Sequence, residues 1–298
     1  MKPFAYEKPS TLSQALKLLT SQGERARAIA GGTDLLVRMK EKSLSPEMLV
    51  DIQGLSELKA LDLSQDGLHL GALCTHAEIA SSSLVLDHAP VLAQASRSVG
   101  AVQTRNLGTL GGNLCTGVPS MDGAPALLVL EAKAHIASEG GVRSLPLSQF
   151  FRGPLLTALA PGELLQEIVI PLSCLQKPAS FHKFGRRKAL SLALVNAAAS
   201  FRLDKTGRIL EPLVALGAVA PTPMRSPNAE DYLAGKSPED AQVLQKAGQL
   251  AAEEAKPIDD FRASAIYRRE LIKVLVRRTL GDCAALAQER SLNCPTSN

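Results

Sequence analysis

The sequence has few aromatic residues and no long apolar run. Tryptophan is absent and Phe, Tyr and Trp together make up 3% of the 298 residues, so stacking platforms for nucleic-acid bases are not expected. No apolar run reaches the roughly 18 residues of a membrane-spanning helix, and the first residues lack the apolar segment of a secretory signal. The 33 Lys and Arg nearly balance 29 Asp and Glu, which argues against a nucleic-acid partner.

Paired cysteines are also missing. The 5 cysteines are widely spaced and no C-x-x-C pair occurs, which argues against disulfides, a zinc site or an iron–sulfur cluster and favours a reducing cytoplasm. Cys74 and His76 could be two metal ligands, or a buried thiol beside an ordinary polar histidine. Because no companion pair accompanies them, we predict no metal site.

The common catalytic signatures are absent as well. The chain has no G-x-S-x-G, no H-E-x-x-H, no G-x-G-x-x-G, no phosphate-binding P-loop and no paired acidic cluster. Its histidines are scattered along the chain, so no catalytic residue is predicted. If the protein is an enzyme, the difficult chemistry belongs to a cofactor that the protein positions.

The length allows about two domains, and the pattern changes after Pro171. Before it, helices (10–20, 75–81, 90–100, 124–130) mix with strands (25–30, 48–52, 67–73, 132–138, 163–171). After it, three strands with a hairpin turn at 204–207 precede helices at 237–256 and from 264 onward. We therefore predict an α+β chain with domains at 1–174 and 175–290.

The last helix has two faces. Leu271, Ile272, Leu275, Val276 and Leu280 form an apolar face. Its opposite face is expected to be basic and exposed, with Arg268, Arg269, Lys273, Arg277 and Arg278. That basic face either contacts an anionic partner or is simply solvated.

The first glycine-rich loop follows the predicted strand at 25–30. It comprises Ile29, Ala30, Gly31, Gly32, Thr33, Asp34, Leu35 and Leu36. Paired glycines allow positive φ and close approach of a ligand, and successive amides can form an anion-binding concavity. Thr33 or Asp34 could cap the following helix. Taken alone, the loop is either a phosphate site or an ordinary tight turn.

The second glycine-rich loop lies at 108–113. Its candidate binding residues are Thr109, Gly111, Gly112 and Asn113. Two such loops in one domain, each with polar side chains, favour a cofactor that carries a diphosphate.

Several motifs in order resemble a known family. They are 30–34 (AGGTD), 103–113 (QTRNLGTLGGN), 120–122 (SMD), 161–165 (PGELL), 168–171 (IVIP) and 184–189 (FGRRKA). Together they resemble the FAD-binding medium subunit of the molybdenum hydroxylases, the type found in xanthine dehydrogenase and carbon monoxide dehydrogenase. The resemblance covers almost the whole chain.

The resemblance implies a fold and a set of FAD contacts. The fold would be a two-lobed FAD domain of the vanillyl-alcohol-oxidase type, followed by a C-terminal domain of a small antiparallel sheet with helices. Both glycine loops would hold the FAD diphosphate. Asp122 would contact the ribose or adenosine side, or cap the next helix; Leu165 would pack near the adenine, and Lys183 would lie near the flavin. Some relatives have His where this chain has Thr33, so FAD is expected to be non-covalent.

The implied function is electron transfer within a larger complex. Molybdopterin would sit on a large partner and [2Fe–2S] clusters on a small partner, and FAD on this chain would pass electrons to an acceptor such as NAD. The relatives that carry an extra cluster on this subunit have a Cys-rich insertion, which this chain lacks. The alternatives are a stand-alone FAD-dependent oxidoreductase of the same fold and a nucleotide-binding scaffold without flavin.

Overall fold

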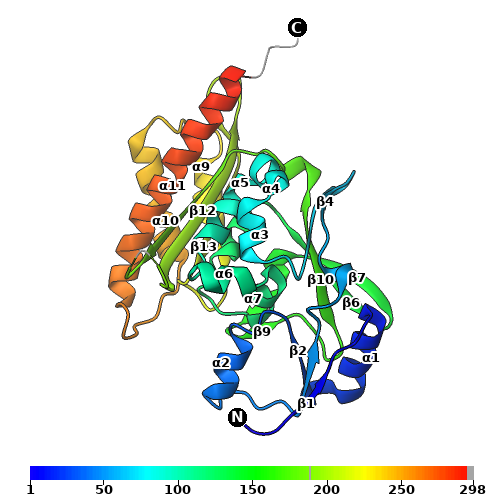
Figure 1. Ribbon diagram of the computed structural model, residues 1–298. Helices are drawn as coiled ribbons and strands as arrows, with labels where there is room; N and C mark the ends of the chain where they lie inside the picture. Colours follow the sequence, from blue (N-terminus) through cyan, green and yellow to red (C-terminus); the bar gives the residue numbers. More distant parts are fainter. Residues whose placement is uncertain (188, 294–298) are drawn as a thin grey trace.

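The computed structural model describes residues 1–187 and 189–293, which fold into a small N-terminal lobe and a larger layered body (Figure 1). The lobe contains a parallel three-stranded sheet in the order β1-β3-β2. Its elements are β1 (Ala5–Glu7), α1 (Leu12–Gln22), β2 (Ala26–Ile29), α2 (Leu35–Lys40) and β3 (Met48–Asp51). Ala15, Leu16 and Leu19 of α1 pack with Ala26 and Val50 of the sheet, as the predicted helical stripe requires.

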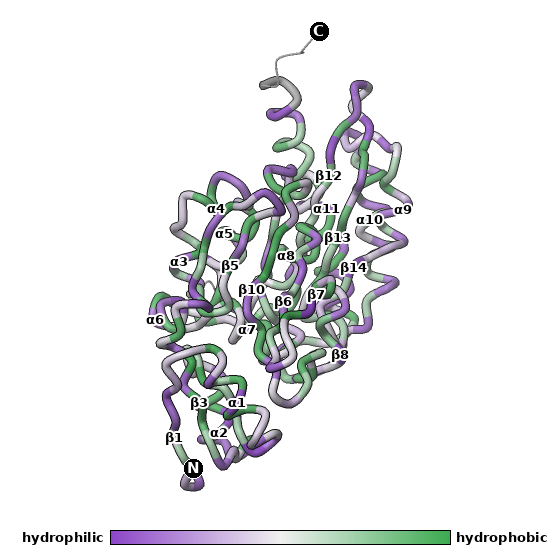
Figure 2. The backbone as a smooth tube through the Cα atoms, turned by 90° about the vertical axis from the view of Figure 1, so that its right-hand side faces the viewer, coloured by the Kyte–Doolittle hydropathy of each residue, from purple (hydrophilic) through white to green (hydrophobic). Residues whose placement is uncertain are grey.

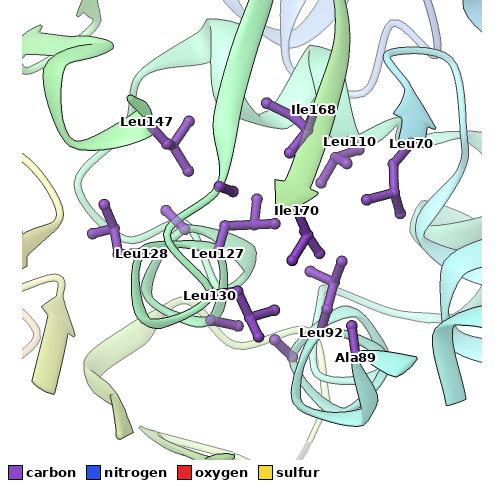
Figure 3. Close-up of a cluster of buried hydrophobic side chains, with 14 of the residues drawn as sticks. Leu70, Ala89, Leu92, Leu110, Leu127, Leu128, Leu130, Leu147, Ile168 and Ile170 are labelled. Atoms are coloured by element: carbon purple, nitrogen blue, oxygen red, sulfur yellow. The ribbon is translucent and has the colours of Figure 1, made fainter. Parts of the chain in front are cut away.

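A five-stranded antiparallel sheet forms the first layer of the body, in the order β4-β5-β10-β6-β7. Its strands are β4 (Leu61–Leu63), β5 (Gly67–Gly71), β6 (Lys133–Ser138), β7 (Gly141–Pro146) and β10 (Leu164–Pro171). Alternate residues such as Leu68 and Leu70 of β5 and Ile168 and Ile170 of β10 point into the main core (Figure 3).

Short helices cover that apolar face. They are α3 (His76–Ser81), α4 (Ser83–His88), α5 (Pro90–Arg97), α6 (Val102–Leu107), α7 (Leu110–Thr116) and α8 (Gly123–Val129). Figure 3 shows Leu92, Leu110 and Leu127 of this layer turned toward Ile168 and Ile170. A two-stranded hairpin, β8 (Phe151–Gly153) and β9 (Leu156–Thr157), adjoins the layer.

The C-terminal part is a four-stranded antiparallel sheet with helices on one face. It comprises β11 (Ala179–Gly185), β12 (Ala193–Leu203), β13 (Ile209–Gly217), β14 (Met224–Arg225), α9 (Pro227–Leu233), α10 (Ala241–Glu254) and α11 (Ala265–Asn293). Four short 3-10 helices complete the element order: η1 (Gly23–Arg25), η2 (Ser56–Leu58), η3 (Leu147–Gln149) and η4 (Leu172–Cys174). Along β12, Ala197, Ala199 and Phe201 face α10 and α11, whereas Ala198 belongs to the main core beside α8.

Most expected elements are present, with two corrections. The turn at 204–207 joins β12 to β13 as predicted, with Gly207 at φ 77°. The second glycine-rich loop at 108–113 is not all loop, because α7 begins at Leu110. Arg268 is not on an exposed basic face: it is 2% exposed, donates to the carbonyls of Leu194 and Ala218, and pairs with Asp260.

Candidate functional site

A cavity of about 520 Å³ lies where the N-terminal lobe meets the body, a size typical of ligand pockets. Both glycine loops line it. Of the predicted site residues, the lining includes Ala30, Gly31, Gly32, Thr33, Asp34, Leu35, Thr109, Gly111, Gly112, Asn113 and Leu165. The structure therefore gathers these residues, which are far apart in sequence, around one space.

The first loop presents unpaired amides. Gly32 has φ 69°, the left-handed region that glycine adopts without strain. Within the described residues, the backbone amides of Gly32, Thr33, Asp34 and Leu35 donate no hydrogen bond. The expected cap is wrong, since neither Thr33 nor Asp34 caps α2 with its side chain. Successive free amides beside a cavity form a concavity suited to a phosphate group.

The two loops lie against each other at Gly31. A Cβ built on Gly31 would lie 1.8 Å from the carbonyl oxygen of Leu107, so this position tolerates no side chain. The Thr33 hydroxyl would lie 3.5 Å from a Cβ on Gly108. Glycine at 31 thus lets the first loop meet the segment that leads into the second.

The second loop is anchored to the segment before α3. The amide of Leu110 donates to the carbonyl of Cys74 at 2.8 Å, and that of Gly111 donates to Ala72 at 2.9 Å. A Cβ on Gly111 would lie 2.5 Å from the Ala72 Cβ, so packing rather than ligand contact requires this glycine.

Polar groups of the second loop face the cavity. The Thr109 hydroxyl accepts from the amide of Gly112 at 3.0 Å and so caps α7. The Asn113 side-chain oxygen is buried with no partner among the described residues. A buried acceptor without a partner fits a ligand that donates to it.

Charged residues missed by the sequence analysis also line the cavity. Arg38 of α2 lies four residues after Asp34, and Arg27 and Glu24 also line the cavity. Burial raises the pKa of the Asp34 carboxyl, while the Arg38 charge opposes that rise. A basic residue four positions after the loop aspartate was the signal available in the sequence.

A second wall comes from the β8–β9 hairpin and the segment leading into β10. Leu155 and Leu156 are 50% and 58% exposed, yet both line the cavity. The amide of Leu155 donates to the carbonyl of Gly117 at 2.9 Å, which ties the hairpin to the end of α7. No motif in this hairpin marked it as part of a site.

Some predicted site residues do not line the cavity. Ile29 is buried in a small cluster with Met39 and Leu49, and the Leu36 side chain packs over Gly32, so both support the first loop from behind. Asp122 and Lys183 also lie outside the lining.

Asp122 and Lys183 form a buried ion pair between the two parts of the chain. Lys183 Nζ lies 2.5 Å from Asp122 Oδ2 and donates to the carbonyl of Ser98 at 2.9 Å. The Asn196 amide donates to Asp122 Oδ1 at 3.0 Å. Asp122 does not cap α8 with its side chain. Because Ser98 precedes Val99, which lines the cavity, the bond from Lys183 to Ser98 ties the pair to a segment of the cavity wall.

Cys74 and His76 are both buried. Among the described residues, no group of His, Cys, Asp and Glu has the arrangement to hold a metal ion. His76 is 1% exposed, and burial together with the Arg105 charge lowers its pKa to about 4. It is a buried neutral histidine that lines the cavity, and its Nε2 has no partner among the described residues, so it differs from the ordinary polar histidine that the sequence left open.

The fold and site define a flavin-binding subunit. Residues 2–173 match the family model for the FAD-binding domain in molybdopterin dehydrogenase, and residues 179–283 match the CO dehydrogenase flavoprotein C-terminal domain. The chain therefore belongs to the FAD-binding subunits of the molybdopterin dehydrogenases, a family of oxidoreductases. The expected fold class and the resemblance are confirmed.

Individual relatives are similar over nearly their full length. The xanthine dehydrogenase FAD-binding subunit of Escherichia coli O157:H7 is 33% identical, over 95% of this chain and 97% of the relative. Carbon monoxide dehydrogenase from Hydrogenophaga pseudoflava has a chain that matches with a TM-score of 0.92 and 30% identity, over 96% of this chain and 98% of its own. A chain of quinoline 2-oxidoreductase from Pseudomonas putida 86 matches with a TM-score of 0.90 and 32% identity, over 96% of this chain and 99% of its own.

In residues 1–187 and 189–293, no helix has both the length and the apolar character that crossing a bilayer would require.

Proposed function

We propose that this chain binds FAD non-covalently between its two glycine loops and serves as the electron-transfer subunit of a molybdenum hydroxylase complex. Iron–sulfur clusters on one partner subunit would supply the electrons, molybdopterin would sit on another, and NAD is the proposed type of acceptor. We place the complex in the cytoplasm. The cysteines at 74, 115, 174 and 283 are free thiols, which supports a reducing compartment.

The observation that carries this proposal is the convergence of both loops on one cavity. The unpaired amides from Gly32 to Leu35 and the Arg38 guanidinium give the diphosphate hydrogen bonds and positive charge. Thr109 holds the second loop in place, and Asn113 offers a buried acceptor to the cofactor. Leu165 gives an apolar wall for a ring.

The chain supplies position and environment, while FAD when bound supplies the redox chemistry. The loops orient the diphosphate, and the Leu155–Leu156 segment reduces the access of water. We propose that the Asp122–Lys183 pair holds the C-terminal sheet near the flavin end of the site, so that Lys183 positions that end without contacting the cofactor. We also propose that the FAD-binding domain spans residues 1–174 and that the C-terminal domain spans residues 175–290.

The need for partners follows from what this chain offers. Among the described residues no cluster of metal ligands occurs, and we propose that the other redox centres belong to other chains. Relatives carry names such as nicotine 6-hydroxylase medium subunit, from Paenarthrobacter nicotinovorans, which describe one chain of several.

Loop variants test the proposal. Val at position 32 must adopt a φ of 69°, at a cost of about 1–3 kcal/mol, and its Cβ would lie 3.1 Å from the Leu36 side chain, so the loop must shift. We expect Gly32→Val to weaken FAD binding at least about tenfold in fluorescence titrations. Gly140→Ala, in an exposed turn, is the matched control. Equal affinity in Gly32→Val and in the wild type would contradict the loop assignment.

A further inference from the structure

One buried histidine in the wall of the cavity has a ring nitrogen without a partner. His76, the first residue of α3, is 1% exposed and lines the cavity. Its Nε2 is buried and forms no hydrogen bond with any of the described residues. Because buried polar groups are nearly always paired, an unpaired one in a cavity wall points to a ligand that pairs with it.

His76 lies where the two glycine loops meet. Its amide donates to the carbonyl of Gly108 at 3.0 Å, and an isolated β-bridge pairs Thr75 with Thr109. A Cβ built on Gly108 would lie 3.5 Å from the Thr33 hydroxyl oxygen and 3.8 Å from His76 Cδ2, the ring carbon bonded to Nε2. Figure 1 and Figure 2 both show α3 beside α6 and α7, on the side of the body next to the N-terminal lobe. The Nε2 edge of the imidazole therefore lies on the same side of Gly108 as the Thr33 hydroxyl.

The partner of the other ring nitrogen sets the tautomer of His76. Its Nδ1 lies 3.5 Å from the hydroxyl oxygen of Ser96 on α5, and Ser96 is fully buried. That hydroxyl has no other hydrogen-bond partner among the described residues, so its proton stays unpaired unless it is donated to Nδ1. Nδ1 is then the acceptor, and the single proton of the neutral ring is on Nε2. His76 thus presents a hydrogen-bond donor to the cavity.

The charge near this donor is positive. Burial, and after it the charge of Arg105 on α6, lowers the pKa of His76 to about 4, so the ring is neutral at pH 7. In the part of the chain that the structure describes, the Arg105 guanidinium forms no ion pair with a carboxylate. A donor with an unpaired cation nearby fits an anionic oxygen as its acceptor.

We propose that His76 donates a hydrogen bond from Nε2 to the diphosphate of FAD where the two glycine loops meet. The inference rests on the proposed function, because it needs FAD in the cavity. The unpaired amides from Gly32 to Leu35 supply donors from the first loop, and His76 adds one from the wall beside the second. Because His76 is shielded from water, its hydrogen bond to an anion is stronger than the same bond at an exposed site.

Two substitutions separate the donor from the packing of the ring. His76→Leu removes both ring nitrogens, whereas His76→Gln keeps an amide N–H that can reach the position of Nε2. His88→Leu is the matched control, since His88 lies at the end of α4 and outside the lining of the cavity. The FAD affinity of each folded variant is measured by fluorescence titration, and ³¹P NMR of bound FAD reports on its diphosphate.

The tautomer is measured on the wild type, so this part of the test needs no variant that folds. ¹⁵N NMR of the histidine-labelled chain shows which ring nitrogen carries the proton. The His76 signal is assigned as the one that is missing from His76→Gln.

We expect His76→Leu to weaken FAD binding at least about tenfold, His76→Gln to stay within about threefold of the wild type, and His88→Leu to bind normally. The proton of His76 should be on Nε2, and the ³¹P signals of bound FAD should shift in His76→Leu. A proton on Nδ1, wild-type affinity in His76→Leu, an equal loss in His76→Gln, or unshifted ³¹P signals would each overturn the contact. A wild-type chain that binds no FAD would instead refute the proposed function, and the contact with it.

Discussion

Removing the cation of the buried ion pair should destabilise the protein in a pH-dependent way. In Lys183→Met the Asp122 carboxylate loses a partner 2.5 Å away. The two side chains are 12% and 7% exposed, so solvent does little to replace the lost charge. Breaking a buried pair costs about 3–5 kcal/mol, and because Asn196 still donates to Asp122 we expect about 3 kcal/mol at pH 7.

The sign of the pH dependence follows from the pKa of Asp122. Burial raises that pKa above 3.8, and the Lys183 charge opposes the rise, so the pKa is higher still in Lys183→Met. A carboxyl whose pKa is raised on folding costs stability as the pH rises from its unfolded value through its folded value. The difference between variant and wild type should therefore be largest at pH 7 and shrink toward pH 4.

Urea unfolding of the variant and the wild type across that pH range measures the effect. The double variant Asp122→Asn with Lys183→Met removes both charges and keeps the shape of the carboxyl. We expect it to recover part of the lost stability at pH 7 and to show little of the pH dependence. A cost in Lys183→Met that stays constant from pH 4 to pH 7 would refute the assignment of a buried, charge-paired Asp122.

Further predictions concern packing and titration elsewhere. Gly31→Ala should separate the two loops and lower both FAD affinity and stability in calorimetry, whereas Gly140→Ala should change neither; a tolerated Gly31→Ala would contradict the close contact with Leu107. His69 has carboxylate oxygens at 2.9 and 3.0 Å from its two ring nitrogens, and these raise its pKa against the opposing effect of burial. Its stabilising contribution should thus be complete below pH 6.5 and lost as the pH rises through the folded pKa, so His69→Asn should cost stability only at the acid end. Arg268→Met should cost about 3 kcal/mol in urea unfolding, because two carbonyls lose their donor and Asp260, which keeps Arg262, loses one of its two cations, while the exposed Arg277→Met should stay within about 0.5 kcal/mol; equal effects would contradict this view of α11.

The sequence predicted the elements whose patterns are local. The stripe of Leu12, Ala15, Leu16 and Leu19 gave α1, and the turn at 204–207 gave the β12–β13 hairpin. Both rest on short-range chemistry, namely the helical period and the turn preference of glycine and aspartate. The glycine pairs likewise indicated two loops that could meet a phosphate.

Features that depend on distant contacts were missed. Arg268 was assigned to the exposed face of α11 by its helical spacing, but the Asp260 carboxylate and the carbonyls at 194 and 218 draw it inside. The β8–β9 hairpin has no strong alternation, and its place beside the cavity depends on the bond from Leu155 to Gly117. Pattern alone could not show that Asp122 would pair with Lys183 rather than cap α8.

The glycines of the two loops are required for two different reasons, which the sequence alone cannot distinguish. Gly32 is required by its positive φ, whereas Gly31 and Gly111 are required because Leu107 and Ala72 approach so closely. A contact between segments separated by tens of residues leaves no local trace. Only the structure distinguishes a glycine required by its backbone conformation from a glycine required by close packing.

FAD binding by the wild-type chain is the most direct test. The visible spectrum of the purified chain is recorded before and after addition of FAD, and the cofactor released by acid is identified by chromatography. The measurement is repeated on the complex purified with its native partners. We expect one FAD per chain, released intact and therefore non-covalent. A folded chain that holds no flavin in either preparation would contradict the assignment of the cavity to FAD.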